Sequence, residues 1–307
     1  MTGFTFGLLS RSVAASGAEW RAAVRRAEDL GFDVFYVSDH VDGRLSPFTA
    51  LAAAGQISSR MRVGHLVLGN DLRDPVAVAH ESATADILTD GRFELGIGTG
   101  WKAPDYRALG LREDPMGVRM TRLEEALRII RTAWRGEPFT TEGAHYGSRD
   151  VPALPRPVQQ PPPVLIGAGG PRMLALAGRN ADIVNIIPRT RGSGRGPDVD
   201  PADCTPEAFA AKVDAIREAA AGHEVRISTT ILGIALDGDD SVTEQMRNGF
   251  DTLWEAMQGS PWVFRGSART VADQIRANRE RYGLTHLICY DYAMSALAPV
   301  LEELVKG

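Results

Sequence analysis

The stretch PVLIGAGGPRMLALAG, residues 163–178, contains an apolar run, a glycine-rich turn and the start of a helix. An apolar run of this kind is typical of a strand that is buried on both faces of a parallel sheet. Glycines in the turn let backbone N–H groups close on a phosphate at a helix N-terminus, where the helix dipole also favours negative charge. The stretch therefore predicts one β/α unit with a phosphate-binding turn.

The glycine spacing does not match the dinucleotide-binding pattern G-x-G-x-x-G. Gly167 and Gly169 supply the first two glycines, but the sixth position is Arg172. The acidic residue that such sites carry about 20 residues further on is not clearly present either. A different kind of phosphate cradle is needed.

Units of the same kind recur on both sides of this stretch. Short apolar runs alternate with longer amphipathic stretches, which is the pattern of strands alternating with helices. The predicted strands are 4–10, 33–40, 61–69, 92–98, 164–168, 182–187, 225–236 and 286–290. The predicted helices are 17–32, 46–60, 75–88, 116–134, 171–180, 206–221, 241–258, 270–282 and 294–305.

Eight β/α units that close on themselves form a TIM barrel, whose active site lies at the carboxyl ends of the strands. We predict an α/β fold of this (β/α)8 type as a single domain over residues 1–307. Two insertions are expected, a hairpin with a proline-rich excursion at 138–162 and a flexible loop at 188–206. A doubly wound open sheet is the alternative. In a barrel, the following residues converge at one rim: Asp39, His40, Asn70, Gly98 to Trp101, Gly167 to Gly170, and Asn185 to Pro188.

Composition excludes several classes of partner. The net charge of −5 argues against nucleic acid, which requires a basic excess. No apolar run approaches the ~20 residues of a membrane span, and the first residues, MTGFTFGLLSRS, lack the pattern of a secretion signal. Cys204 and Cys289 are far apart in the sequence and are expected to be reduced thiols of a cytoplasmic protein.

Metal and covalent-nucleophile sites are not expected. His80 and Glu81 begin an H-E-x-x-H pattern, but Thr84 stands where the second histidine belongs. No G-x-S-x-G motif is present, and neither cysteine is flanked like a nucleophile. The other histidines without metal-ligand spacing are His65, His145, His223 and His286.

Four segments together resemble the bacterial-luciferase-like family of flavin and deazaflavin enzymes. They are GFDVFYVSDH (31–40), the block from Arg62 to Trp101 that ends in DGRFELGIGTGW, residues 163–186, and residues 267–288. The ordered set covers nearly the whole chain, and its middle block is the most specific part. The resemblance implies a TIM barrel with an insertion that binds FMN or coenzyme F420, a 5-deazaflavin.

The resemblance also implies which residues hold the cofactor. The phosphate cradle is expected at Gly167, Ala168, Gly169 and Gly170. A non-prolyl cis peptide in a bulge of the third strand, against which the ring rests, is expected at Leu66–Val67. Asn70 is expected at the pyrimidine edge of the ring. The remaining residues expected to contact the cofactor are Gly98, Thr99, Gly100, Trp101 and Asn185.

His40 is the strongest catalytic candidate, because histidine gives or takes a proton near neutral pH. The deazaflavin-dependent sugar-phosphate dehydrogenases that the chain resembles end their second strand in an Asp–His pair, which Asp39 and His40 match. Asp39 is therefore the second catalytic candidate, expected to hold or orient the site. Those enzymes carry a glutamate directly after the GTG of the fourth strand, where this chain has Trp101. This departure argues against sugar-phosphate oxidation and favours an apolar or unsaturated substrate.

The sequence thus predicts an F420-dependent oxidoreductase that acts on a small molecule. The bias toward arginine over lysine, typical of GC-rich coding, favours this cofactor because actinobacterial members of the group often use it. The alternatives are an FMN-dependent monooxygenase supplied with reduced flavin by a separate reductase, and a non-catalytic flavin-binding barrel. A homodimer is expected from the family. The loop arginines Arg189, Arg191 and Arg195 suit a lid over the acidic tail of the deazaflavin.

Overall fold

The strands of the central sheet follow one another in an order that returns to its beginning. The computed structural model describes every residue except 1–2, 12, 192–197, 238–252 and 307. The order of neighbouring strands across the sheet is β3 (Arg62–His65), β2 (Val34–Val37), β1 (Thr5–Ser10), β15 (Leu284–Tyr290), β12 (Arg226–Ile231), β9 (Ile183–Ile186), β8 (Val164–Ala168), β5 (Phe93–Gly98) and β4 (Leu68–Gly69). An additional pairing of β3 with β5 closes the order, with β3 and β4 as two pieces of one predicted strand.

The predicted fold class is confirmed by this topology. Among the described residues, the strands of the central sheet correspond one for one to the eight predicted from the sequence. Pairs such as β1–β15, β12–β15 and β5–β8 are parallel, as expected for strands joined by helices. The fold is therefore α/β and of the (β/α)8 type.

The chain divides into two compact units. Unit 1 consists of Met1–Ser10, Arg26–Val34 and Gly167–Gly307, and unit 2 consists of Arg11–Arg25 and Phe35–Ile166. The candidate residues fall into two sets along this division. Gly167 to Gly170 and Asn185 belong to unit 1, whereas the residues from Asp39 to Trp101 belong to unit 2. Each set is described within its own unit below.

Unit 1 places helices against β9, β12 and β15. Its helices are α6 (Pro171–Asn180), α7 (Pro206–Ala220), α9 (Ala268–Tyr282) and α10 (Met294–Lys306), with the 3₁₀ turns η2 (Pro201–Asp203) and η3 (Asp291–Ala293). Helix α6 lies against α7 with little space between them, since a Cβ on Gly178 would lie 2.7 Å from the carbonyl oxygen of Ile216. Phe209 meets the rings of Trp262 and Tyr282 edge-on, and this aromatic cluster fills the core beneath α7.

Unit 1 differs from the sequence prediction in two places. The predicted strand 225–236 is interrupted at Leu232, because both Leu232 and Gly233 donate their N–H to the carbonyl of Trp262. The second half, β13 (Gly233–Leu236), pairs instead with β14 (Val263–Gly266) in a separate parallel pair. Most of the predicted helix 241–258 lies outside the described residues. The segment 188–206 contains η2 and a short antiparallel pair, β10 (Thr190–Arg191) with β11 (Asp198–Val199).

Unit 2 contains the predicted helices α2 (Pro47–Ile57), α3 (Pro75–Leu88) and α5 (Met116–Ala133) and a short helix that was not predicted, α4 (Ala103–Ala108). Helix α1 (Gly17–Asp29) begins in this unit. Asp74 caps α3 by accepting the N–H of Val76 at 2.8 Å, in agreement with the proline-started helix expected there. The 3₁₀ turn η1 (Asn70–Leu72) follows β4 directly.

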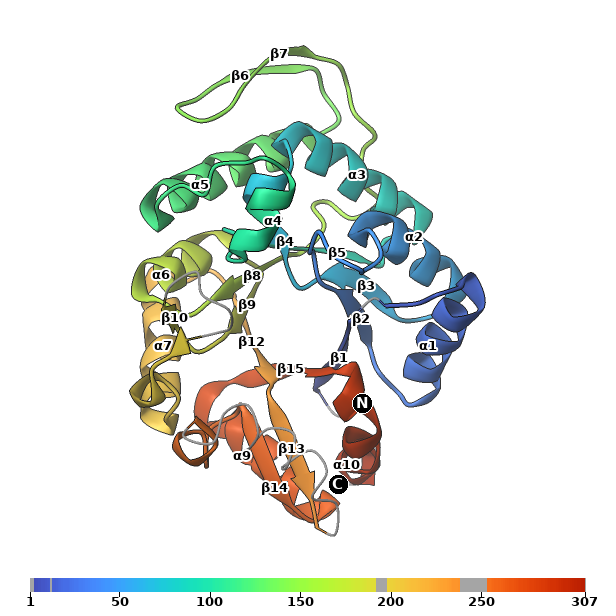
Figure 1. Cartoon of the computed structure of the whole chain (residues 1–307), viewed down its shortest axis with the longest axis vertical. Coiled ribbons are helices and arrows are strands. Elements are labelled where there is room, and N and C mark those ends of the chain that lie inside the picture. The colour runs from blue at the N-terminus through green and yellow to red at the C-terminus, as the bar shows by residue number, and fades with distance from the viewer. Residues whose placement is uncertain (1–2, 12, 192–197, 238–252, 307) are drawn as a thin grey trace. The chain divides into compact units, whose positions relative to one another are not determined.

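The hairpin in unit 2 is confirmed as β6 (Phe139–Glu142) and β7 (Gly147–Val151), which run antiparallel beside α5 and α3 in Figure 1. Buried Glu125 of α5 fixes the hairpin, since its carboxylate accepts the backbone N–H groups of His145 and Tyr146. The hairpin thereby brings Tyr146 against η1.

The interior of unit 2 contains a histidine in an apolar environment. His65 is fully buried between Phe48 and Phe93, with ring centroids 4.5 and 5.5 Å away. Neither of its ring nitrogens has a hydrogen-bond partner among the described residues. Burial, with a smaller effect of the Arg73 charge, holds the pKa of His65 well below its ordinary value of 6.5. The ring is therefore neutral at physiological pH.

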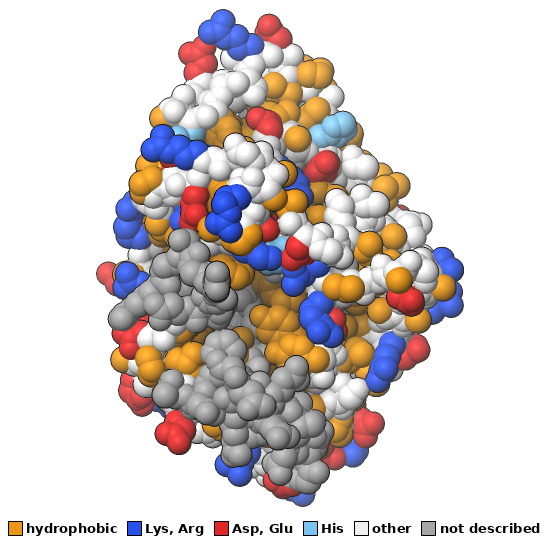
Figure 2. Space-filling view, viewed as in Figure 1, with side chains coloured by type: hydrophobic (Ala, Val, Ile, Leu, Met, Phe, Trp, Pro, Cys, Tyr) orange, Lys and Arg blue, Asp and Glu red, His pale blue; other side chains and the backbone are white. Residues whose placement is uncertain are grey.

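Surface features are consistent with the composition. Basic and acidic side chains are intermixed over the described part of the face in Figure 2. Within the described residues, no helix has the length and apolar character that crossing a bilayer requires. Cys204 and Cys289 are both buried free thiols, as the sequence predicted.

Candidate active site

His40 follows the carboxyl end of β2 and is held by a carboxylate from α4. Its Nδ1 lies 2.8 Å from Oδ2 of Asp105, and Oδ1 of the same carboxylate accepts the N–H of Val41 at 3.1 Å. Asp105 is buried, whereas the His40 side chain is 15% exposed. Trp101 meets the imidazole edge-on at a centroid distance of 5.7 Å. His40 thus has one nitrogen fixed by a buried acid and a ring edge that solvent reaches.

Asp39 has a different role from its neighbour. Its buried carboxylate accepts two hydrogen bonds from the guanidinium of Arg73, at 2.5 and 2.9 Å, and a third from the N–H of Gly69 at 3.0 Å. Such a bidentate charge-assisted pair is strong and geometrically specific. Asp39 therefore fixes β4 and the start of α3, and its expected role in the site stays a prediction.

The predicted cis peptide is confirmed at Leu66–Val67, in the bulge that separates β3 from β4. Both residues are half-buried, and Gly98 of β5 lies alongside, since a Cβ there would come 3.0 Å from Cγ2 of Val67. Asn70 begins η1 and is buried. Its amide donates to the hydroxyl of Tyr146 at 3.1 Å. Burial raises the pKa of Tyr146 to about 12, so this hydroxyl stays protonated.

The loop after β5 turns at a glycine that no other residue replaces without strain. Gly100 has φ +75°, and a Cβ there would lie 2.7 Å from the hydroxyl of Tyr106. Its carbonyl accepts from Arg119 at 2.8 Å. Thr99 is half-exposed and touches the sulfur of Met116 at 3.5 Å, while Trp101 is 48% exposed. The loop presents a threonine and an indole at its surface.

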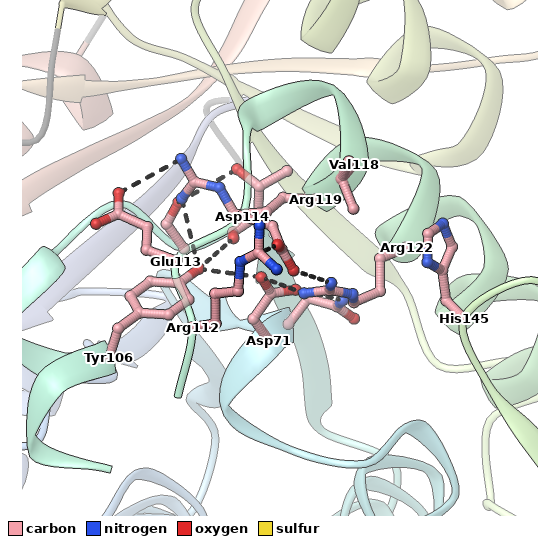
Figure 3. A network of polar contacts seen from close by, with 12 residues as sticks. Asp71, Tyr106, Arg112, Glu113, Asp114, Val118, Arg119, Arg122 and His145 are labelled. Atoms are coloured by element: carbon pink, nitrogen blue, oxygen red, sulfur yellow. Dashed lines mark hydrogen bonds and ion pairs between the residues drawn. The ribbon is translucent and has the colours of Figure 1, made fainter. Parts of the chain in front are cut away.

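A network of charged side chains, drawn in Figure 3, contacts this loop through Tyr106 and Arg119, which donate to the loop's carbonyls. Asp71 of η1 accepts from the hydroxyl of Tyr106 at 3.2 Å and from Arg122 at 2.7 Å. Arg122 also pairs with Asp114 at 2.5 Å. In Figure 3, Arg119 extends toward both Glu113 and Tyr106. The network joins η1, α4 and the start of α5 into one rigid support.

In unit 1, the turn between β8 and α6 has the properties of an anion cradle. A Cβ on Gly169 would lie 2.9 Å from the carbonyl oxygen of Ile187 and 3.0 Å from that of Pro188, so the position requires glycine. Helix α6 begins after Gly170 with no side-chain cap and no acidic residue in its first turn. The Arg189 side chain lies beside Gly170, with Nε 3.8 Å from where a Cβ would be. These features favour a bound anion.

The cradle rests on a buried lysine. Lys212 of α7 donates to the carbonyl of Gly169 at 2.6 Å and pairs with Asp203 at 2.8 Å. Asp203 in turn accepts the N–H of Arg189 at 2.5 Å. Ala168 accepts the N–H of Ile187 at 3.0 Å. Arg191 is placed in β10 without a described side chain, and Arg195 lies outside the described residues.

Asn185 is engaged within the sheet. Its amide nitrogen donates to Ser228 and its oxygen accepts from Thr230, each at 3.2 Å. Both partners belong to β12, and Asn185 is buried. The side chain therefore cross-links β9 and β12, and its expected contact with a cofactor stays a prediction.

Sequence reasoning missed the acid that binds His40 and the residues that support it. Asp105 lies in α4, a helix of six residues that is too short for hydrophobic periodicity to reveal. A local signal was present, since Pro104 and Asp105 in the segment WKAPDYRALG are typical of a helix's first turn. Nothing in the sequence links residue 105 with residue 40. In the described part of the chain, no group of three or more metal-ligating side chains occurs.

The chain belongs to the luciferase-like monooxygenase family, whose model matches residues 4–195. Among curated relatives, F420-dependent glucose-6-phosphate dehydrogenases are similar. That of Microbacterium testaceum is 38% identical over 164 residues, which is 51% of this chain and 48% of the relative. That of Intrasporangium calvum is 38% identical over 168 residues, 51% of this chain and 50% of the relative. The chain thus spans about half the length of the curated relatives it matches.

Solved structures with the same fold cover nearly the whole chain. The F420-dependent tetrahydromethanopterin reductase of Methanopyrus kandleri superposes with a TM-score of 0.76 at 21% identity, covering 99% of both chains. An F420-dependent secondary alcohol dehydrogenase in complex with an F420-acetone adduct gives 0.79 at 17% identity, covering 99% of this chain and 98% of that one. A monooxygenase from Streptomyces bottropensis gives 0.75 at 20% identity, covering 98% of both. These likenesses show the luciferase-like barrel fold.

Proposed function

We propose that this protein is an oxidoreductase that transfers a hydride between coenzyme F420 and a small organic substrate. The observation that carries the proposal is His40, which lies at the end of β2 with Nδ1 on a buried carboxylate and Trp101 against its edge. The relatives from Microbacterium testaceum and Intrasporangium calvum are F420-dependent dehydrogenases, which supports the choice of cofactor. The proposal assigns catalysis to His40 and support of the site to Asp39.

Residues of each unit, taken separately, suit one part of such a cofactor. The uncapped start of α6, the obligatory glycine at 169 and the Arg189 side chain suit its phosphate. The cis peptide lies at Leu66–Val67, and Gly98 packs directly against Val67, which fixes the shape of the bulge where we place the flat ring. Gly100 is a further proposed contact. Further proposed contacts are Gly167, Ala168, Gly170, Asn70, Thr99, Trp101 and Asn185.

When bound, coenzyme F420 supplies a ring carbon that accepts or donates the hydride. His40 then takes a proton from the substrate, or returns one, at its Nε2 atom. Trp101 lies edge-on beside the imidazole. Asp39 contributes indirectly, since its pairing with Arg73 holds the bulge where the cis peptide lies.

The substrate we propose has an apolar or unsaturated portion beside the reacting group. Trp101, which is 48% exposed, lies against the His40 ring, and Val41, which is 44% exposed, follows His40 in the chain. Met116 is also exposed and lies beside Thr99. An apolar surface of this kind stabilises hydrocarbon and gives nothing to a phosphate. A sugar phosphate therefore fits this side of His40 poorly.

Titration of the purified protein with F420 and with FMN, at low and high salt, tests the choice of cofactor. We expect tight, salt-sensitive binding of F420, because arginine side chains attract its acidic tail. A preference for FMN would favour a monooxygenase supplied by a separate reductase. Hydride exchange is then measured with a panel of alcohols, ketones and enones, and with glucose 6-phosphate. Cofactor binding without exchange, unaltered by His40→Ala, would indicate a non-catalytic carrier.

A further inference from the structure

The imidazole of His40 makes its hydrogen bond through one nitrogen. Nδ1 lies 2.8 Å from Oδ2 of Asp105, and among the described residues Nε2 has no hydrogen-bond partner. The carboxylate is almost completely buried, whereas the ring is partly open. The polar contact is thus on the protein side of the ring, and the open side carries Nε2.

This contact determines where the proton of a neutral imidazole lies. An ionised carboxylate only accepts hydrogen bonds, so the nitrogen facing it carries the hydrogen. Nδ1 is then the protonated nitrogen, and Nε2 presents a lone pair. With the opposite assignment, two lone pairs would face each other at 2.8 Å, which costs energy in a buried setting.

Asp105 is itself held firmly enough to impose this state. Its second oxygen, Oδ1, accepts the N–H of Val41, the residue directly after His40. The N–H of Asp105 donates to the backbone carbonyl of Lys102 at 2.9 Å, in the first turn of α4. The next residue, Tyr106, is bonded to Asp71 and to the carbonyl of Thr99. The helix therefore cannot turn without breaking buried hydrogen bonds.

We infer that Asp105 is a positioning residue that holds His40 in the tautomer with Nδ1 protonated and Nε2 free to take a proton. This inference rests on the proposed function for its catalytic consequence. When the O–H bond of a bound hydroxyl breaks and its proton joins Nε2, the imidazolium that forms lies against the Asp105 carboxylate. A nearby buried anion stabilises that positive charge without moving.

The direct test is the tautomer of His40, read by nitrogen NMR of histidine-labelled protein at pH 8, with no cofactor or substrate added. His40→Ala identifies the signals. We expect wild-type His40 to show a protonated Nδ1 and a bare Nε2. In Asp105→Asn, which keeps the shape but removes the charge, we expect a mixture of tautomers or a reversal, and Asp105→Glu should restore part of the wild-type signal.

Turnover gives a second readout. Asp105→Asn should lower kcat by about 10²-fold, within the usual range for acid–base catalysis, with a much smaller change in KM. The matched control is Asp42→Asn, two residues after His40 in the chain. The Asp42 carboxylate pairs with Lys102 and Arg44 rather than with His40. Its kcat and its His40 signals should match wild type.

An unchanged His40 tautomer in folded Asp105→Asn would overturn the inference. If that variant does not fold, Asp105→Ser gives the same reading with a smaller side chain. A tautomer that responds to Asp105 in a protein without hydride exchange would support the positioning role and refute the proposed function. The two failures are thereby distinguishable.

Discussion

At the scale of single residues, two adjacent side chains at the end of β2 have separate tasks. Asp39 is saturated by Arg73 and the N–H of Gly69, and it fixes backbone. His40 has one nitrogen bound and the other open. The Asp–His pair visible in the sequence is therefore not a dyad in space, and the acid that serves His40 comes from α4.

Gly169 gives a prediction about the cradle. In Gly169→Ala, the new Cβ would press on the carbonyls of Ile187 and Pro188, and backbone atoms cannot swing aside. We expect affinity for F420 to fall by at least about tenfold and the free energy of unfolding to fall by about 1–3 kcal/mol. Fluorescence titration and denaturant unfolding measure the two effects.

Gly170→Ala is the matched control for this variant. Its Cβ would meet only the Arg189 side chain, at 3.8 Å or more, and Gly170 has a φ of −89° that alanine adopts freely. We expect unfolding close to wild type. Equal losses of stability in the two variants would show that crowding at residue 169 is not the cause.

The neutral state of His65 predicts a pH dependence of stability. In the unfolded chain this histidine takes up a proton below about pH 6.5, whereas burial keeps it neutral in the folded protein. The unfolded state therefore binds more protons as the pH falls. Stability should decline below pH 6.5, with a contribution from this residue of up to about 1.4 kcal/mol per pH unit.

Urea unfolding of wild type and His65→Leu at pH 7.5, 6.5 and 5.5 measures this contribution. The slope of unfolding free energy with pH should be flatter in the variant, whatever its absolute stability. His80→Leu, at an exposed position of α3, is the control and should keep the wild-type slope. Identical slopes in wild type and His65→Leu would contradict the assignment.

At the scale of elements, α4 and η1 form the support of the site. Neither element has the length for a periodic hydrophobic pattern, and each is held by side chains from elsewhere in unit 2. Asp71 and Tyr106 connect the two elements, and Arg122 brings in α5. The positions of α4 and η1 therefore depend on contacts with other elements of unit 2 rather than on local sequence.

Tyr106→Phe tests this support. The single hydrogen of the hydroxyl faces both Asp71 and the carbonyl of Thr99, and the hydroxyl oxygen accepts from Arg119, so its loss removes these contacts from the network. We expect the free energy of unfolding to fall by about 1–3 kcal/mol, measured by denaturant unfolding. A loss of less than about 0.5 kcal/mol, the range of ordinary surface substitutions, would contradict this role of the network.

Elements with a strong local pattern were predictable, and those fixed by distant partners were not. The barrel strands, the hairpin and the proline-started helices follow from apolar runs, turn residues and caps in the sequence. The division of strand 225–236 depends on the carbonyl of Trp262, which local sequence does not reveal. The same reason explains why His40 was found but Asp105 was not.

At the scale of the whole chain, both thiols lie in the interior. Burial, followed by the Asp203 charge, raises the pKa of Cys204 to about 11, and burial also raises the pKa of Cys289. The reactive species is the thiolate, so a raised pKa leaves almost none of it at pH 8. We expect native protein to react slowly with a thiol reagent and both cysteines to react once denaturant unfolds the chain.

Absorbance of the released thiol product, followed at increasing urea, measures this behaviour. The labelling rate should rise along the unfolding transition. Rapid labelling of either cysteine without denaturant would show that its surroundings open in the native state. Single replacements Cys204→Ala and Cys289→Ala assign each phase.

The adjacency of Asp105 and Tyr106 on one short helix limits how this protein can be re-engineered. One residue inserted or deleted between Trp101 and Asp105 would rotate the helix by roughly 100°, so that the imidazole and the buried tyrosine could not both keep their partners. Trp101 and Met116 are each nearly half exposed and contact His40 and Thr99 through their side chains alone. Libraries aimed at new substrates should randomise these two side chains and preserve the loop length.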